Sequence, residues 1–220
     1  MITLYGDVTK TRANRCSWML KEIGIDYVNE PLAFRPGAEK PAAFLALNPN
    51  GKCPTLQDGD LVLYESLAIN LYLAKRYGGA LGPQSPEEEA LMMQWSFWVA
   101  TEVEKPLLLT AAIRHLFEPK QPADEELAIA MKRLSRPFSA LEQHLQDRDF
   151  ILGDRFTAAD LNVAAVMHFI PIAEIDVSTF TAMKRWLETC LDRPAAIDVQ
   201  SVNFRVPTPK SSRDIFAMFV

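Results

Sequence analysis

A loop near the N-terminus gathers basic and hydroxyl side chains in front of a helix-like segment. Lys10, Arg12 and Arg15 lie where acidic side chains normally complement the positive end of a helix dipole. Positive charges at that end are unfavourable, so a bound anion would explain them. Thr9 and Thr11 lie in the same loop and offer hydroxyl groups, either to a ligand or as a helix cap. The loop is therefore a candidate anion site, with a solvated basic turn capped by Thr11 as the structural alternative.

Two later segments combine turn chemistry with backbone groups that can bind a ligand. Cys53-Pro54 lies between an Asn-Gly turn and a strand-like run, where a proline is tolerated and its bond can be cis. Ser66 occupies the predicted N-cap of the following helix, and the N–H groups at that end favour a carboxylate. A turn proline and a simple helix cap are the structural alternatives.

A further pattern is explained by folding alone. Thr157 and Asp160 have the spacing of a capping box, and the apolar Phe156 precedes them. We expect this box to start a helix and to take no part in chemistry. His168 is expected in the core and not as a ligand, and Trp95 and Trp98 are expected in the core or at an interface.

The composition is that of an acidic globular chain. Its 220 residues are 49% hydrophobic and 23% charged, and 23 Lys+Arg against 28 Asp+Glu give a net charge of −5. The lack of a basic block argues against nucleic acid as a partner. No apolar run approaches the roughly 20 residues of a membrane span, and the N-terminus does not have the pattern of a signal peptide. Scattered cysteines (Cys16, Cys53, Cys190) and separated histidines predict a cytoplasmic protein without disulfides or metal.

Short strand-like and helix-like segments alternate before residue 80. Their apolar spacing and turn residues predict the order β-α-β-α-β-β-α, a small α/β sandwich. The expected elements are Ile2–Tyr5, Arg12–Ile23, Asp26–Glu30, Pro41–Leu47, Thr55–Gln57, Leu61–Tyr64 and Ser66–Tyr77. A loop is expected over Pro31–Lys40.

Almost everything after residue 87 has a helical pattern. One pattern runs from Glu88 towards Phe117 with a kink or break around Pro106, and another covers Ala123–Gln146 with a bend or break at Pro137. Two more helices are expected at Thr157–Phe169 and Thr179–Asp192. The predicted division is an α/β domain at 1–79, a linker at 80–87, an all-α domain at 88–206 and a tail at 207–220.

Four segments resemble the cytosolic glutathione S-transferase superfamily, and the chain resembles a bacterial-type member of it. They are Trp18–Tyr27, Asn48–Leu56, Leu63–Leu73 and the Phe156–Asp160 box, in the family's order and spacing. The resemblance implies a thioredoxin-like N-terminal domain that binds glutathione and an all-α C-terminal domain. It also implies a homodimer.

The resemblance assigns a use to several of these residues. It implies a cis Pro54 that exposes the Cys53 backbone to the cysteinyl unit of glutathione as an added strand. Ser66 would take the γ-glutamyl carboxylate, Glu65 would face the γ-glutamyl ammonium, and Lys52 would reach the glycyl carboxylate. Glutathione is thus the expected co-substrate, used without a metal and with a small hydrophobic electrophile as the second substrate.

Catalysis in this family means forming a thiolate, because a thiol with a pKa of roughly 8.5 is mostly protonated at neutral pH. Many members place Tyr, Ser or Cys in the loop after the first strand, and this loop contains neither Ser nor Cys. Alignment back from Trp18 puts Thr11 at the activating position, with Thr9 second and Tyr5 third. A threonine hydroxyl can donate a hydrogen bond to the thiolate.

Two other classes of protein stay open. A thiol–disulfide oxidoreductase of this fold would carry a cysteine in that loop, and Cys16 comes more than a turn too late. A non-enzymatic glutathione-fold module would instead carry ligands or bind other proteins. For the enzyme, a detoxifying transferase, we expect the electrophile pocket in the helical domain. Its candidate residues are Trp98, His115, Phe117 and Phe169.

Overall fold

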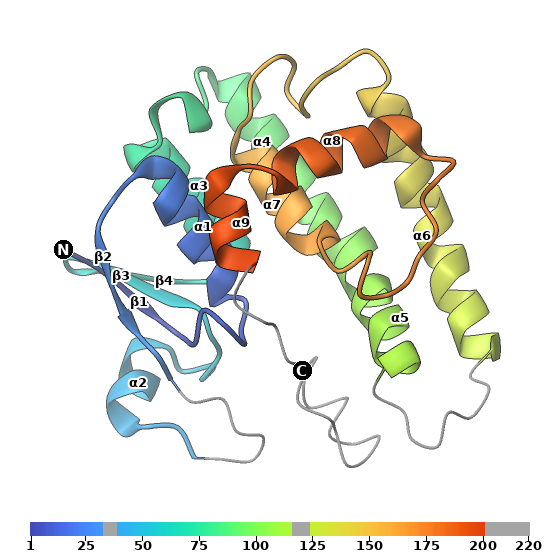
Figure 1. The fold of residues 1–220 in the computed structure, drawn as a ribbon. Helices are drawn as coiled ribbons and strands as arrows, with labels where there is room; N and C mark the ends of the chain where they lie inside the picture. The colour runs from blue at the N-terminus through green and yellow to red at the C-terminus, as the bar shows by residue number, and fades with distance from the viewer. Residues whose placement is uncertain (33–38, 116–123, 201–220) are drawn as a thin grey trace. The chain divides into compact units, whose positions relative to one another are not determined.

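A four-stranded mixed sheet lies at the centre of the N-terminal part of the chain (Figure 1). The computed structural model describes residues 1–32, 39–115 and 124–200. The strands are β1 (Ile2–Tyr5), β2 (Tyr27–Glu30), β3 (Thr55–Asp58) and β4 (Leu61–Tyr64), in the spatial order β2-β1-β3-β4. β1 is parallel to β2 and antiparallel to β3, while β3 and β4 form the predicted hairpin. The C-terminal ends of β1 and β2 and the start of β3 therefore meet at the same end of the sheet. There, Tyr5 is opposite both Glu30 and Thr55.

Helices α1 (Ala13–Ile23) and α3 (Ser66–Tyr77) pack against each other in this unit, and α2 (Ala42–Leu47) precedes β3. α1 buries one face (Cys16, Met19 and Leu20 are 0% exposed) and ends at Gly24, whose φ of 75° a side chain would resist. The element order agrees with the predicted α/β sandwich. A 3-10 turn at Gly79–Leu81 follows α3.

Contacts divide the chain into two compact units, and among the described residues the first consists of the chain up to Glu89 together with Arg193 and the residues up to Gln200. Helix α9 (Pro194–Gln200) belongs to this first unit and lies against α1 (Figure 1). Arg193 donates from Nε and Nη2 to the two carboxylate oxygens of Glu22 on α1, over 2.8 and 2.7 Å. Such a two-pronged charged pair gives α9 a defined attachment to α1. The boundaries expected at 79, 87 and 206 stay predictions.

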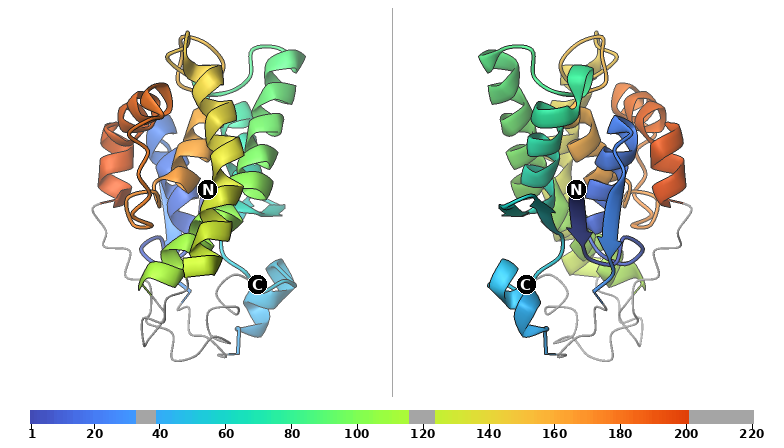
Figure 2. Two further views of the ribbon diagram at one scale, coloured as in Figure 1. Left: turned by 90° about the vertical axis from the view of Figure 1, so that its right-hand side faces the viewer. Right: turned by 90° about the vertical axis from the view of Figure 1, so that its left-hand side faces the viewer.

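The second unit, Ala90–Asp192 among the described residues, is helical. It contains most of α4 (Pro86–Trp98), then a π-helical segment at Val99–Glu104, α5 (Lys105–His115), α6 (Asp124–Leu145), α7 (Ala158–Met167) and α8 (Thr181–Leu191). α5 and α6 are long neighbours (Figure 2). Every residue of α7 is buried, so this helix forms the centre of the unit. None of the helices in the described ranges is long and apolar enough to cross a membrane.

The two predicted interruptions by proline have different outcomes. The irregularity expected around Pro106 is present as the π-helical turn at Val99–Glu104, directly before α5. The bend or break expected at Pro137 is not a break, because α6 continues from Asp124 to Leu145 with this proline inside it. A buried face holds the helix together on both sides of Pro137. Its members are Ala130, Leu134, Phe138, Leu141 and Leu145.

The capping box at the start of α7 is present as predicted. Thr157 Oγ1 accepts from the Ala159 N–H over 3.3 Å, and Asp160 accepts from the Thr157 N–H over 2.9 Å. Asp160 also accepts from the Ile151 N–H (2.7 Å) and from Trp186 Nε1 (2.9 Å). Burial raises the pKa of Asp160, and these hydrogen bonds oppose that effect. The carboxyl group therefore joins α7, α8 and the preceding loop.

Some sequence-based expectations lie outside the described residues. These are the tail at 207–220, Phe117, and residues 33–38 of the predicted loop. His115 is the last residue of α5.

Candidate functional site

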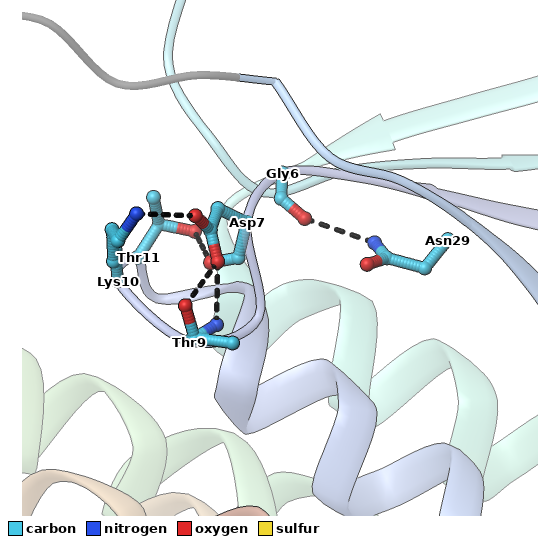
Figure 3. Close-up of polar contacts among 6 residues, drawn as sticks. All are labelled: Gly6, Asp7, Thr9, Lys10, Thr11 and Asn29. Atoms are coloured by element: carbon cyan, nitrogen blue, oxygen red, sulfur yellow. Dashed lines mark hydrogen bonds and ion pairs between the residues drawn. The ribbon is translucent and has the colours of Figure 1, made fainter. Parts of the chain in front are cut away.

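The loop after β1 packs directly against the loop that contains Pro54. Gly6 ends β1 with a φ of 133°, and a Cβ placed there would lie 2.9 Å from Cys53 Cβ and 3.3 Å from Thr11 Oγ1. A side chain at Gly6 would therefore hold the two loops apart. From the edge strand β2, Asn29 Nδ2 donates to the Gly6 carbonyl over 2.9 Å, which fixes the point where the loop leaves the sheet (Figure 3).

Asp7 is the centre of the loop's hydrogen bonds (Figure 3). Its Oδ1 accepts from the Thr9 N–H over 2.8 Å and from Thr9 Oγ1 over 2.5 Å, while its Oδ2 lies 3.4 Å from Lys10 Nζ. Its carbonyl accepts from the N–H (2.9 Å) and Oγ1 (2.8 Å) of Thr11. Burial alone would raise the pKa of Asp7, but the Thr9 hydrogen bonds and the Lys10 charge hold it below its usual value. Asp7 is therefore a carboxylate at neutral pH, a role that the sequence analysis missed.

Thr11 makes the contact expected if its role is to support the start of helix α1 and not to bind a ligand. Its Oγ1 accepts from the Ala13 N–H over 3.2 Å at the start of α1. The N-cap itself is Arg12, one residue before α1, and its side chain makes no capping hydrogen bond. Thr11 thus supports the first turn of α1 from outside the helix, next to Gly6 and Cys53. Its assignment as thiol activator, and that of Thr9, stays a prediction.

The basic residues of the candidate anion site do not act as one cluster. Lys10 pairs with Asp7 inside the loop. Arg15 is on α1 and only 3% exposed, and its Nη1 donates to Ser66 Oγ on α3 over 3.4 Å. The positive charges are therefore divided between the loop and the start of α3.

The Cys53–Pro54 peptide bond is cis, and Pro54 is buried just before β3. Asn48, fully buried, supports this loop by donating from Nδ2 to the Lys52 carbonyl (2.9 Å) and to Thr55 Oγ1 (3.0 Å). Within the described residues, neither the N–H nor the C=O of Cys53 has a hydrogen-bond partner. The Lys52 side chain is exposed. The loop therefore presents an unused backbone donor and acceptor beside Gly6.

Helix α3 has the predicted bounds, but its N-cap differs by one residue from the prediction. Glu65, and not Ser66, is at the N-cap, with φ 74° and ψ 108°, and Ser66 is the first helical residue. A positive φ in a non-glycine residue costs energy, and residues strained in this way cluster at active sites and ligand-binding sites. The Glu65 side chain is exposed and has no partner among the described residues. Ser66 is 5% exposed, and its hydroxyl accepts from Arg15 but donates to no group in the described part of the chain.

The cysteines near this site are not thiolates. Cys16 is fully buried, and burial raises the pKa of its thiol well above the usual range. Burial also raises the pKa of Cys53, where the Lys40 charge opposes the effect and the Asp7 charge adds to it. A reactive cysteine needs a lowered pKa, so these positions do not favour thiol–disulfide exchange.

The candidates for an electrophile pocket have different surroundings. Phe169 is 6% exposed and lies against His168, with ring centroids 4.2 Å apart, so it belongs to the core. Trp95 is 7% exposed, in agreement with the prediction, while Trp98 is half-buried with its ring 4.9 Å from that of Trp95. In the described part of the chain, no group of three or more His, Cys, Asp or Glu side chains could hold a metal ion.

Comparison with known proteins gives matches along nearly the whole chain. The family model described as glutathione S-transferase, N-terminal domain, matches residues 1–75, and that for the C-terminal domain matches residues 105–194. Glutathione S-transferase 1 of Triticum aestivum is 32% identical, with 94% of this chain and 95% of the relative covered. Glutathione S-transferase 3 of Zea mays is also 32% identical, with 96% and 98% covered.

Solved structures match with similar coverage. A theta class glutathione S-transferase from Xanthomonas axonopodis pv. citri, with glutathione bound, is 27% identical with a TM-score of 0.80, covering 92% of this chain and 98% of that one. A glutathione S-transferase-I bound with lactoylglutathione is 28% identical with a TM-score of 0.79, covering 92% and 99%.

Proposed function

Since the chain belongs to the cytosolic glutathione S-transferase superfamily and is a glutathione transferase, we propose where it holds glutathione and how it forms the thiolate. The proposed site lies between the loop after β1, the loop of Pro54 and the start of α3. The observation that carries it is the convergence of Cys53 Cβ and Thr11 Oγ1 on Gly6. This brings the proposed cysteinyl contact and the proposed thiol activator to the same place.

The cysteinyl unit of glutathione pairs with the backbone of Cys53. The N–H and C=O of this residue have no partner among the described residues, which leaves both for an added strand. Pro54 follows directly and leads into β3, so the contact lies at the end of the sheet where β3 begins. Lys52, exposed on the same loop, lies within reach of the glycyl carboxylate.

The γ-glutamyl unit binds at the start of α3. The Ser66 hydroxyl accepts from Arg15, so its own proton can be given to the γ-glutamyl carboxylate. The N–H groups of the first helical turn and the helix dipole favour the same negative group. Glu65, whose carboxylate is exposed, faces the ammonium group of the ligand.

The thiol lies next to the loop of Thr9 and Thr11. Thr11 is the first choice as hydroxyl donor because its Oγ1 lies beside Gly6, across from Cys53. Thr9 is the second choice, and Tyr5, whose hydroxyl donates to Gln57 Oε1 over 3.0 Å, is the third. A donor to the charged form lowers the pKa of a thiol.

The remaining proposals concern the setting of the enzyme. We propose a cytoplasmic homodimer that conjugates small hydrophobic electrophiles in detoxification. Cys16, Cys53 and Cys190 are in no disulfide bond, which is the state expected in a reducing compartment. The solved relative from Xanthomonas axonopodis pv. citri carries glutathione, which supports the same ligand here.

Turnover with an activated aryl chloride at saturating glutathione tests this function. The wild-type chain should form the glutathione conjugate, and the double variant Glu65→Ala/Ser66→Ala should lose glutathione affinity together with kcat/KM. Tight glutathione binding by calorimetry with no turnover of several electrophiles would favour the non-enzymatic module.

A further inference from the structure

Both threonine hydroxyls of the thiol loop are already donating (Figure 3). A hydroxyl has a single proton. Thr9 gives its proton to the Asp7 carboxylate, and Thr11 gives its proton to the Asp7 carbonyl. Thr11 Oγ1 in addition accepts from Ala13. Either threonine must give up a hydrogen bond to Asp7 before it can donate to a thiolate.

The charge of Asp7 makes this loop an unfavourable place for a second anion. Asp7 follows Gly6, which is packed against Cys53, and its carboxylate is directed to the Thr9–Lys10 side of the loop. Like charges that approach within a few ångström raise each other's pKa. A thiolate formed beside this loop therefore needs a compensating positive charge.

Lys10 is the cation placed to supply that charge. Its Nζ lies 3.4 Å from Asp7 Oδ2, and its side chain is 56% exposed, so the ammonium group can move without disturbing the core. An ammonium group has three N–H donors, and the ion pair with Asp7 occupies one side of it. The chain places Lys10 between the two threonines.

We propose that Lys10 is a further catalytic residue, whose ammonium group stabilises the thiolate of bound glutathione against the opposing negative charge of Asp7. This inference rests on the glutathione site proposed above. When the thiol ionises, its proton leaves to solvent water and Lys10 keeps all of its own protons. The S–H bond is the only bond broken, and the ammonium group then bridges the carboxylate and the new thiolate.

Other charged groups surround the same site. Lys40 acts on the Cys53 thiol from the neighbouring loop, and Arg12 occupies the N-cap of α1. Arg15 lies with Ser66, at the end that we assign to the γ-glutamyl unit. Lys184→Met on α8 is the matched control, because Lys184 also pairs with a carboxylate (3.7 Å to Glu188 Oε1) and its side chain is 53% exposed.

The test is the pKa of the glutathione thiol in the complex, followed by ultraviolet thiolate absorbance against pH. Lys10→Met should raise this pKa by about one unit. This is the low end of the shifts that a neighbouring charge causes, because the Lys10 side chain is exposed. Lys10→Arg should keep most of the wild-type value. Asp7→Asn keeps an acceptor oxygen for Thr9 and removes the negative charge, so it should lower the thiol pKa. The double variant Asp7→Asn/Lys10→Met should return close to wild type.

If the role of Lys10 is purely structural, the variants should show a different pattern of thiol pKa values. If Lys10 only braced the loop, Asp7→Asn and Lys10→Met would change the thiol pKa in the same direction, and that result would overturn the proposal. An unshifted pKa in Lys10→Met, or an equal shift in Lys184→Met, would overturn it as well. The Lys10→Met shift should shrink with added salt, because an exposed charge is screened. If wild-type protein failed to bind glutathione in calorimetry, the site itself would be wrong, and that outcome is separate from the pKa series.

Discussion

Arg15 donates from Nη1 to Ser66 Oγ over 3.4 Å, so a buried cation of α1 lies against the first residue of α3. An arginine can only donate, and the serine oxygen must therefore act as the acceptor. The serine proton is then directed to another group. In this way Arg15 on α1 sets the direction of the hydroxyl hydrogen bond that we assign to the ligand's carboxylate.

The first prediction concerns this end of the site. Ser66→Ala and Glu65→Ala should each weaken glutathione binding roughly tenfold or more, because hydrogen bonds to charged groups contribute about 1.5–3 kcal/mol. Isothermal calorimetry measures the effect. Ser139→Ala, an exposed serine on α6 whose hydroxyl donates to Ser135, is the control and should bind as wild type does. Unchanged glutathione affinity in both site variants would show that the proposed γ-glutamyl site is wrong.

The sequence best predicts those elements that depend on interactions between residues close together in the chain. Ser66–Tyr77 has the predicted bounds of α3, because its apolar spacing and Gly78 are both local signals. The capping box of Thr157 and Asp160 is equally local, with a spacing of three residues. The proposed glutathione site rests on a resemblance in which the residues around Pro54 and Ser66 are the most specific part.

Contacts between distant residues could not be predicted in this way. The Arg15–Ser66 bond joins residues 51 apart, and the Arg193–Glu22 pair joins residues 171 apart. Helix α6 is not broken at Pro137, because a buried face outweighs the one hydrogen bond that a proline removes. Asp7 is a different case, since Asp7 and Thr9 have the local spacing of an Asx turn that the sequence analysis overlooked.

Asp160 should act on folding and not on chemistry. Asp160→Ala removes the acceptor for the Ile151 N–H, the Thr157 N–H and Trp186 Nε1, all of which are buried. Buried donors without a partner cost about 1–3 kcal/mol each, so the loss should exceed the roughly 0.5–2 kcal/mol of a simple cap. A thermal melt should show a lower Tm, while the folded fraction keeps its glutathione affinity. A variant of wild-type stability that had lost binding would contradict this assignment.

Asp58 should give a stability contribution that depends on pH. Tyr77 and Tyr72 donate to Asp58 Oδ2 over 2.5 and 2.8 Å, and these hydrogen bonds, the Tyr77 bond first, hold the pKa of Asp58 below its usual value against burial. A lowered folded-state pKa stabilises the native state above the unfolded value of about 3.9 and loses that effect as pH falls through the folded value. The stability gap between wild type and Asp58→Asn should therefore be constant near neutral pH and shrink in acid. Denaturant midpoints of the two proteins, measured at neutral pH and in acid, give this difference in stability.

Tyr72 gives an independent readout of the same contact. Burial, and then the Asp58 carboxylate, raise the pKa of Tyr72 to about 12. In Asp58→Asn the pKa should move towards the ordinary tyrosine value of about 10. Ultraviolet titration of tyrosinate follows the change, with Tyr72→Phe identifying which transition belongs to this residue. A Tyr72 transition unaffected by Asp58→Asn would refute the pairing.

The last prediction separates the two roles open to Thr11. If its hydroxyl donates to the thiolate, Thr11→Val should raise the pKa of the bound thiol and leave glutathione affinity nearly unchanged, whereas Thr11→Ser should be close to wild type. If the hydroxyl serves only Asp7 and Ala13, Val and Ala variants should both lose about 1 kcal/mol of stability without any change in thiol ionisation. Thiolate absorbance against pH, beside a thermal melt of each variant, measures both quantities. Because the proton of Thr11 already goes to the Asp7 carbonyl, donation to sulfur requires rotation about the Cβ–Oγ1 bond. A stability loss with an unshifted thiol pKa would therefore assign Thr11 to the loop and leave thiolate stabilisation to Lys10 and the backbone.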